Sequence, residues 1–301
     1  YITHNESRRN YNAIADSYID NGINTDLLLG GGTQYFIRED RNLVDEYKKQ
    51  GFQYLEAYDQ LSAIRTDKPV LGLFAPVGLP WSLDDTDRFR LSTMTKAATQ
   101  YLENDKGYFL LIEASQVDWA GHANDVGSAM AEMDDLAKTM EYLEGYVAKQ
   151  PNTLVVLTAD HSTGGFTIAA NGEYKWDPTA IRKLNKSTFT VASEIAEHNA
   201  SVELISDWLS VEISQADVDE IANAKMAAEK ALAAYNLLSE QEKEGKRAPN
   251  VNQAIYIALN KLVDRLTNTG WTSSGHTGID VPVIAIGANK HKFVGGQDNT
   301  D

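Results

Sequence analysis

Residues 108–122 read YFLLIEASQVDWAGH, an apolar run that changes within one residue into a polar segment. The run Tyr108–Ile112 is short, apolar and non-alternating, which is typical of a strand covered on both faces. Four other runs have the same character: Asp26–Leu29, Val70–Phe74, Leu154–Thr158 and Val281–Ile286. The sequence therefore predicts five buried strands.

Apolar residues at helical spacing lie between these runs, from Leu91 to Leu102 and from Met133 to Val147. Strands that alternate with helices predict an α/β fold, a three-layer α/β/α sandwich with a mainly parallel central sheet. From about residue 163 to residue 275 the alternation stops. We expect one domain over residues 1–301 that carries a helical insertion over this stretch.

Within the expected insertion, Ser214 and Asp217 have the spacing of a capping box at the start of a helix. A second helical pattern covers Val251–Leu266. Between them, the charged run Ser239–Arg247 indicates a solvated turn.

The composition excludes several classes of function. The chain has 27 basic and 43 acidic residues, a net charge of −16, which disfavours non-specific binding to nucleic acid or to an anionic membrane. No run approaches the ~18 apolar residues of a membrane helix. The absence of cysteine excludes disulfides, thiolate metal sites and a Cys nucleophile. Metal ligands must therefore be His, Asp or Glu.

Three clusters of ligand-type side chains adjoin predicted strands, and ligands of open α/β sheets bind beyond the carboxyl ends of strands. The clusters are Glu113, Asp118 and His122 after the third strand, Asp160 and His161 after the fourth, and His276 ahead of the fifth. Because His276 precedes its strand, its loop has to fold across the site to join the other clusters.

Asp118 and His122 stand at i, i+4, so on a helix they share one face and could bind one cation. A helix cap and a surface His would explain this pair alone, and Glu113 could be an ordinary residue at a strand end. The joint occurrence of the clusters favours a site. His and carboxylate ligands suit Zn²⁺, and a purely carboxylate position such as Glu113 suits Mg²⁺. Two cations about 4 Å apart would stabilise the attacking and leaving oxygens of a phosphoryl displacement.

Three segments resemble the metal motifs of the alkaline phosphatases: EASQVDWAGH at 113–122, TADHSTGG at 158–165 and GHTGIDVP at 275–282. The resemblance spans nearly the whole chain and is closest to the bacterial, cysteine-free marine type. It implies two zinc ions and one magnesium ion. The implied ligands are Asp118, His122 and His276 for the first zinc, Asp160 and His161 for the second, and Glu113 for the magnesium.

The resemblance also implies residues that contact substrate. The segment HNESR at 4–8 is similar to the family's H-x-x-S-R, whose Arg, here Arg8, clamps phosphate through a bidentate fork. Trp119 stands where some members carry a Lys or His that touches phosphate through water, so phosphate is expected to be held less tightly. Thr163 stands where some members carry a His beside the zinc site, and its hydroxyl would orient a neighbouring carboxylate differently.

The sequence departs from the family pattern at the nucleophile. In the family, a Gly-Asp-Gly supplies a bridging Asp, and the nucleophilic Ser precedes the Arg motif. No Gly-Asp-Gly occurs here, and Asp16-Ser17 follows the Arg motif. We therefore expect a fragment that is truncated at the N-terminus and slightly at the C-terminus, lacks the nucleophilic Ser, and has little turnover alone.

For the complete protein, the resemblance implies hydrolysis of phosphate monoesters through a phosphoserine intermediate, with inorganic phosphate as product and ligand. It further implies a homodimer and a periplasmic or secreted location. Two alternatives remain open. One is a related metal-dependent phosphodiesterase, sulfatase or mutase, although the lack of Cys disfavours a sulfatase. The other is a catalytically inactive module that binds metal or phosphate.

Overall fold

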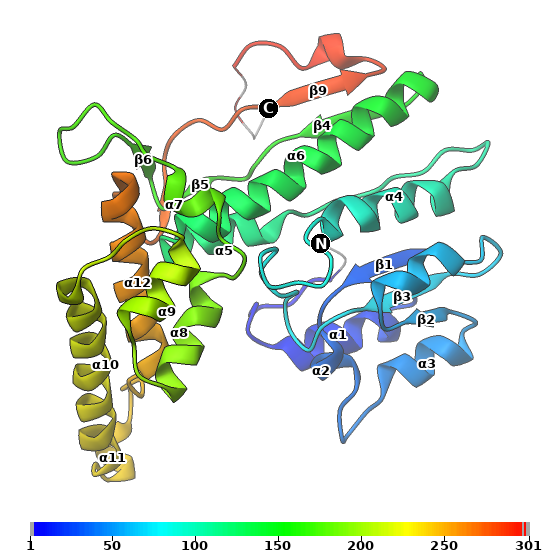
Figure 1. Cartoon of the computed structure of the whole chain (residues 1–301). Helices are drawn as coiled ribbons and strands as arrows, with labels where there is room; N and C mark the ends of the chain where they lie inside the picture. Colours follow the sequence, from blue (N-terminus) through cyan, green and yellow to red (C-terminus); the bar gives the residue numbers. More distant parts are fainter. Residues whose placement is uncertain (1–2, 297, 299–301) are drawn as a thin grey trace. The chain divides into compact units, whose positions relative to one another are not determined.

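The computed structural model describes residues 3–296 and residue 298 (Figure 1). The chain forms two compact units: unit 1 comprises Tyr1–Glu113 and Asp135–Tyr142, and unit 2 comprises Ala114–Asp134 and Leu143–Asp301. The expectation of one domain with an insertion over about 163–275 stays a prediction.

Unit 1 is built on a parallel three-stranded sheet with the order β1-β3-β2. Its strands are β1 (Leu27–Gly30), β2 (Gln53–Leu55) and β3 (Val70–Leu73). The central strand β3 is buried at every residue, because it has a strand on each side and apolar packing on its faces. The predicted strands at Asp26–Leu29 and Val70–Phe74 are confirmed to within one residue.

The helical elements of unit 1 are α1 (Tyr11–Asp20), α2 (Thr33–Phe36), α3 (Leu43–Lys49), the 3-10 helix η1 (Tyr58–Ala63) and α4 (Arg90–Leu102). One core cluster joins α3 to the sheet through Leu43, Tyr47 and Leu71, which are at most 1% exposed. Each fully buried side chain of this kind contributes roughly 1.5–3 kcal/mol of transfer free energy. Unit 1 therefore depends on apolar burial.

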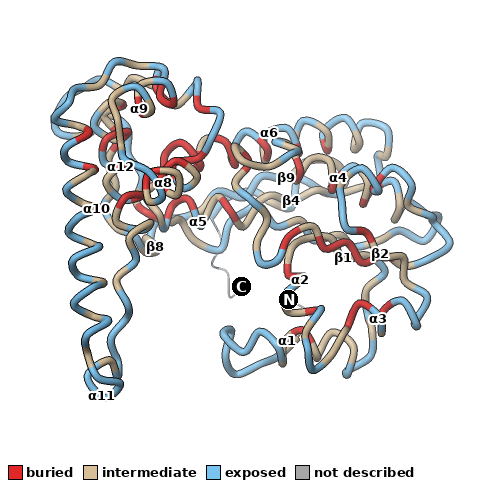
Figure 2. Tube along the Cα trace, turned by 60° about the horizontal axis from the view of Figure 1, so that its bottom comes forward, coloured by how far each residue is buried: buried red, intermediate tan, exposed pale blue. Residues whose placement is uncertain are grey.

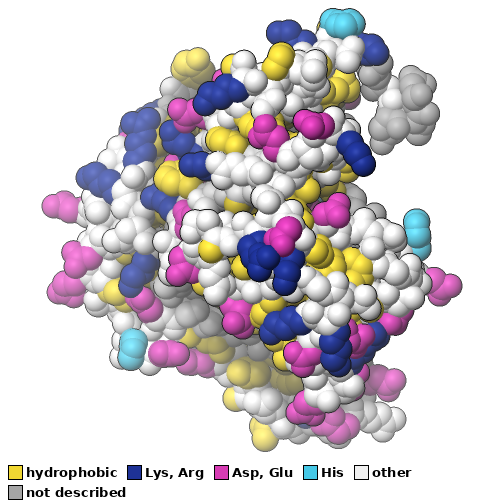
Figure 3. All heavy atoms as spheres, turned by 90° about the vertical axis from the view of Figure 1, so that its right-hand side faces the viewer, with side chains coloured by type: hydrophobic (Ala, Val, Ile, Leu, Met, Phe, Trp, Pro, Cys, Tyr) yellow, Lys and Arg dark blue, Asp and Glu magenta, His cyan; other side chains and the backbone are white. Residues whose placement is uncertain are grey.

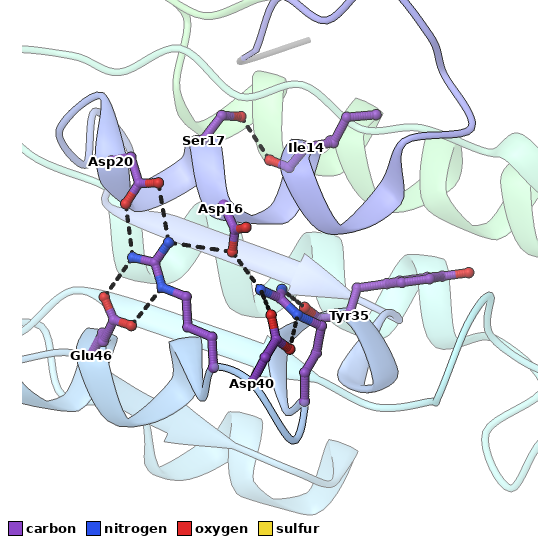
Figure 4. Close-up of polar contacts among 9 residues, drawn as sticks. Ile14, Asp16, Ser17, Asp20, Tyr35, Asp40 and Glu46 are labelled. Carbon is purple, nitrogen blue, oxygen red and sulfur yellow. Dashed lines mark hydrogen bonds and ion pairs between the residues drawn. The ribbon is translucent and has the colours of Figure 1, made fainter.

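Two arginines in the segment between α2 and α3 tie this segment to α1 (Figure 4). Arg41 lies 2.7 Å from Asp20 and 2.8 Å from Glu46, and Arg38 lies 2.7 Å from Asp16. Hydrogen bonds from the Arg41 guanidinium hold the pKa values of Asp20 and Glu46 below their usual range. These ion pairs lie at the periphery of unit 1.

The helical elements of unit 2 are α5 (Ser115–Ala123), α6 (Val126–Lys149), α7 (Thr179–Arg182), α8 (Thr188–Glu197), α9 (Val202–Leu209), α10 (Gln215–Asn236), α11 (Glu240–Lys243), α12 (Val251–Thr267) and η2 (Lys290–Lys292). The middle of α6, Asp135–Tyr142, groups with unit 1. The strands of unit 2 are β4 (Leu154–Leu157), β5 (Ser162–Thr163), β6 (Phe166–Ile168), β7 (Thr269–Trp271), β8 (His276–Thr277) and β9 (Ile284–Gly287). They form three antiparallel pairs, β4-β9, β5-β8 and β6-β7.

Two sequence predictions about strands need correction. Tyr108–Ile112 forms no strand among the described residues, and Phe109 is 88% exposed. An apolar run becomes a strand only when a neighbouring strand pairs with it, and none of the strand pairs among the described residues includes this run. The runs at β4 and β9 are strands, but Leu154, Val156 and Ile284 are more than a third exposed, so they are not covered on both faces as predicted.

The helices predicted in the second half of the chain are confirmed. Ser214 caps α10 and forms the predicted capping box with Asp217. The charged run Ser239–Arg247 is not only a turn, because it contains α11, which Ser239 caps. Figure 2 shows α10 and α11 as largely exposed or intermediate, whereas α12 buries Ile255 and other apolar side chains. Within the described residues, no helix combines the length and the apolarity that crossing a bilayer requires.

The acidic excess of the chain is not gathered in one place on the face that Figure 3 shows. There, Asp and Glu side chains are interspersed with Lys and Arg. Mixed charge of this kind favours solubility and weakens long-range attraction to a polyanion.

Candidate metal centre

Helix α5 places Asp118 and His122 one turn apart. His122 Nε2 lies 3.5 Å from Asp118 Oδ2, so the predicted shared helix face is confirmed. The N-cap of α5 is Ala114, which places Asp118 inside the helix and makes the capping explanation of Asp118 wrong. Both side chains are therefore presented on one face of a regular helix.

The pairing of β5 with β8 brings His276 to this region from a distant part of the sequence. Thr163 stands directly opposite His276 in the ladder, and opposite residues share a face. His161 precedes Thr163 by two residues and approaches His276 from the same side. The rings of His161 and His276 stack with centroids 3.4 Å apart. His276 thus folds across the site, as the sequence analysis required.

Asp118, His161 and His276 each offer one ligand atom, and these atoms lie within 4.8 Å of one another. One carboxylate oxygen and two imidazole nitrogens form a donor set of the kind that would hold zinc. The residues present therefore fit a zinc ion.

The remaining predicted ligands lie at the edge of this group or in unit 1. The His122 ring is 5.1 Å from the His276 ring, and Asp160 Oδ2 is 3.3 Å from His161 Nε2. The group of three thus draws on both predicted zinc sites, and how the ligands divide between two ions stays a prediction. Glu113 and Arg8 are exposed residues of unit 1, and their roles also stay predictions.

Thr163 connects two of the candidate ligands. Its hydroxyl donates to Asp118 Oδ1 and lies 3.3 Å from His161 Nδ1. With Oδ1 engaged, Asp118 presents Oδ2 toward His122. A hydroxyl at this position thus orients the carboxylate, as a residue beside a metal ligand does in many metal sites.

A backbone carbonyl fixes the orientation of the His122 ring. His122 Nδ1 lies 2.6 Å from the carbonyl oxygen of Ser274. A carbonyl oxygen can only accept, so Nδ1 is the donor in this contact, and the ring presents Nε2 to Asp118 Oδ2 at 3.5 Å. Sequence reasoning missed Ser274, because a backbone acceptor 152 residues away leaves no signal in residue type or spacing.

Close backbone packing places α5 against β5. A Cβ atom on Gly121 would lie 3.0 Å from Thr163 Cβ, which is tighter than nine in ten Cβ contacts. Gly121 therefore permits the approach that lets the Thr163 hydroxyl reach Asp118. A larger residue would require Thr163 to shift by a few tenths of an ångström.

The end of α5 is anchored to buried polar groups. Asp125 caps α6 by accepting from the Ser128 amide at 2.9 Å, and it also accepts from the Tyr256 hydroxyl at 2.8 Å. Burial raises the pKa of the Asp125 carboxyl. The Asn260 side chain donates to the carbonyl of Ala123 at 3.0 Å. Helix α12 therefore holds the helix that carries Asp118 and His122.

These features define an α/β protein with a candidate metal centre. The chain belongs to the metal-dependent alkaline phosphatase family, whose family model matches residues 1–301.

Similar proteins agree with this assignment. The chain is 39% identical to alkaline phosphatase 3 of Bacillus subtilis over 310 residues, covering 99% of this chain and 62% of that protein. The crystal structure of a cold-active alkaline phosphatase from the psychrophile Shewanella sp. has a TM-score of 0.84 and 39% identity, covering 99% of this chain and 68% of that one. A TAB5 alkaline phosphatase variant with Mg bound in its M3 site shows the same fold, with a TM-score of 0.60, 22% identity and coverage of 97% and 62%.

These similarities confirm the predicted α/β fold class with a parallel sheet. The chain spans 62% of the length of the Bacillus subtilis relative that it matches.

Proposed function

We propose that the complete protein hydrolyses phosphate monoesters at a centre with two zinc ions and one magnesium ion. The observation that carries this proposal is the convergence of Asp118, His161 and His276 within 4.8 Å in a chain of this family. Bound zinc would supply Lewis-acid stabilisation of the negative charge that develops during phosphoryl transfer.

The proposed ligand sets follow the motifs. Asp118, His122 and His276 hold one zinc, and Asp160 with His161 holds the other. Three contacts support these sets: His122 Nε2 to Asp118 at 3.5 Å, His161 Nε2 to Asp160 at 3.3 Å, and His122 Nδ1 to the carbonyl oxygen of Ser274 at 2.6 Å. Glu113 is proposed for magnesium, a metal that the TAB5 relative also binds.

Arg8 and Trp119 are the proposed substrate contacts. Arg8 is exposed and has no ion pair among the described residues, so its guanidinium is available for a bidentate contact with phosphate. Trp119 follows the ligand Asp118 directly and is 44% exposed. An indole brings no positive charge, so inorganic phosphate is held less tightly than it would be beside Lys.

The proposed nucleophile is a serine that is not among these 301 residues, and the reaction passes through a phosphoserine. The motifs for the nucleophile and the bridging Asp do not occur in the sequence, and the Bacillus subtilis relative is longer than this chain. We further propose a homodimer and a periplasmic or secreted location. If the serine is not supplied from elsewhere, the chain is a module that binds metal and phosphate without turnover.

Zinc binding tests the centre directly. Isothermal titration of the chain with Zn²⁺ is expected to show binding that Asp118→Asn weakens by about 100-fold, since a ligand is lost. The control is Asp177→Asn, which changes a carboxylate that accepts from Thr179 and is not among the candidate ligands, so the affinity is expected to stay unchanged. No zinc binding by the unmodified chain would overturn the proposal.

Hydrolysis of p-nitrophenyl phosphate at alkaline pH, with zinc and magnesium present, tests the placement of the nucleophile. The complete protein is expected to be active and sensitive to EDTA, whereas the 301-residue chain is expected to be nearly inactive. Substantial EDTA-sensitive turnover by the chain alone would show that the nucleophile lies within it.

A further inference from the structure

Trp271, the last residue of β7, lies between helix α12 and the segments that carry the candidate ligands. Its indole N–H donates to Asp264 Oδ1 of α12 at 3.1 Å. Its ring packs edge-on against Phe166, with centroids 5.1 Å apart. The other edge of the indole lies against Gly164, where an added Cβ would come within 2.6 Å of Trp271 Cε3.

Gly164 is the residue at which three segments meet. Its amide donates to the carbonyl of Gly275 at 2.9 Å, and its carbonyl accepts from the amides of Thr272 and Ser273, each at 3.1 Å. A Cβ at this position would also lie 2.8 Å from the carbonyl oxygen of Gly121 in α5. Its φ of +82° is in the left-handed region that favours glycine. A side chain there would be strained in its backbone and would require the Trp271 ring or the Gly121 carbonyl to shift.

Each of the three segments carries candidate ligands. Helix α5 carries Asp118 and His122, the segment before Gly164 carries His161, and the loop 272–275 leads directly into His276. The same loop contains Ser274, whose carbonyl accepts from His122 Nδ1. A displacement of Gly164 would therefore move donors that have to converge within a few ångströms.

We propose that Trp271 is a positioning residue for the metal centre. The indole packs against the backbone of Gly164, and its hydrogen bond to Asp264 attaches it to α12. Helix α12 is itself bonded to the end of α5 through Asn260. This closed path, from α12 through Trp271 and Gly164 to α5 and back, holds the loop 272–275 so that Ser274 and His276 meet their partners. The inference rests on the proposed function in one respect, that the centre binds zinc.

Two other tryptophans of unit 2 show what distinguishes Trp271 from an ordinary packed indole. Trp176 donates to Thr269 Oγ1 at 3.3 Å, and Trp208 donates to the carbonyl of Lys186 at 3.0 Å. Both indoles are hydrogen-bonded, but no atom of either is among the three nearest to a Cβ built on Gly164. Trp176 is therefore a matched control, since it also has one indole hydrogen bond near β7.

The test compares Trp271→Leu, Trp271→Phe and Trp176→Phe in the otherwise unmodified chain, with zinc alone as the probe. Trp271→Leu removes the support and is expected to raise the zinc dissociation constant about tenfold. Trp271→Phe keeps a ring beside Gly164 but loses the bond to Asp264, and is expected to raise it roughly threefold. Trp176→Phe is expected to leave the affinity unchanged.

A second measurement needs no metal. Long-range ¹H–¹⁵N spectra of the zinc-free chain report the environment of His122 Nδ1, which is expected to be hydrogen-bonded to Ser274 in the unmodified chain and in Trp176→Phe. Trp271→Leu is expected to lose the spectral signature of this hydrogen bond, because Ser274 no longer stays within reach. Should Trp271→Leu not fold, Trp271→Phe gives the same comparison on a smaller scale.

The outcomes separate this inference from the proposed function. If the unmodified chain binds no zinc, the proposed function is contradicted, and the hydrogen bond between His122 Nδ1 and Ser274 still decides the role of Trp271. If the Trp271 variants keep both the zinc affinity and the His122–Ser274 hydrogen bond of Trp176→Phe, Trp271 is a packing residue only and the inference is overturned.

Discussion

The parallel sheet of unit 1 and the β5-β8 pair of unit 2 are held in place by different forces. In β3, Val70 and Leu71 are completely buried, and their neighbours are apolar side chains. In β5 and β8, every residue is partly or fully exposed, and position is set by hydrogen bonds and by close backbone contacts at glycine. A region stabilised by apolar area responds to changes in side-chain volume, whereas a region positioned by backbone contact responds to a single added carbon atom.

The largest expected effect is on the stability of unit 1. Leu71→Ala is expected to lower the free energy of unfolding by about 3–5 kcal/mol, since it leaves a cavity beside β3. Leu237→Ala is the control, because Leu237 is 89% exposed and its loss is expected to change little. Urea unfolding measures both. The comparison fails if Leu71→Ala weakens zinc binding in the folded chain as much as a loss of Trp271 does.

The next effect concerns Asp264 of unit 2, a carboxyl group whose charged form is disfavoured by burial. Burial and the nearby Asp125 raise the pKa of Asp264 to about 7. The folded chain therefore binds this proton more tightly than the unfolded chain, so the free energy of unfolding falls as pH rises from about 4 to 7. Asp264→Asn keeps an oxygen that can accept from Trp271 and removes the charge.

Above pH 7 we expect Asp264→Asn to be more stable than the unmodified chain, by roughly 2–4 kcal/mol, with little difference near pH 4. Urea unfolding at pH 5 and at pH 8 measures this. A variant that is no more stable at pH 8 would mean that the Asp264 carboxylate is already well solvated or paired.

A third prediction isolates the close backbone contact at Gly164. Gly164→Ala and Gly172→Ala both place a side chain at a positive φ, +82° and +76°, so both carry a similar backbone cost of about 1 kcal/mol. Only at Gly164 would the new Cβ meet other atoms, because Gly172 has nothing within 4 Å. Gly164→Ala is therefore expected to weaken zinc binding about tenfold and Gly172→Ala not at all, by isothermal titration. Equal affinities would show that the contact does not set the centre.

The smallest effect is expected at the ion pairs of Figure 4. Arg41→Gln removes contacts with Asp16, Asp20 and Glu46, yet Asp20 is more than half exposed and Arg41 about a quarter exposed. Solvent and salt screen such pairs, so the loss of stability is expected to be much smaller than for Leu71→Ala and to shrink in high salt. A large loss that does not depend on salt would place this network among the main supports of unit 1.

Two apolar runs show how far strand prediction reaches. Val70–Phe74 and Tyr108–Ile112 look alike in sequence, yet only the first contains a strand, and Phe109 is 88% exposed. The difference lies in strand pairing, since β1 and β2 flank β3. Composition describes the run itself and carries no information about its neighbours.

The candidate centre likewise has one part that the sequence predicted and one part that depends on strand pairing. The spacing of Asp118 and His122 predicted their shared helix face, and residue type alone excluded thiolate ligands. The stacking of His161 on His276 depends on the ladder between β5 and β8, whose hydroxyls Ser162 and Thr277 are in contact across 115 residues of sequence.

The sequence by itself determined the chemistry that is available and the local elements that present it. His and carboxylate ligands follow from the absence of cysteine, and the start of α10 follows from the Ser214 capping box. Only the tertiary structure decided which candidate ligands converge, that Ser274 orients His122, and that Trp271 packs against Gly164. The physical reason is that helix caps and helix faces depend on neighbours along the chain, whereas a metal centre depends on backbone contacts between distant segments.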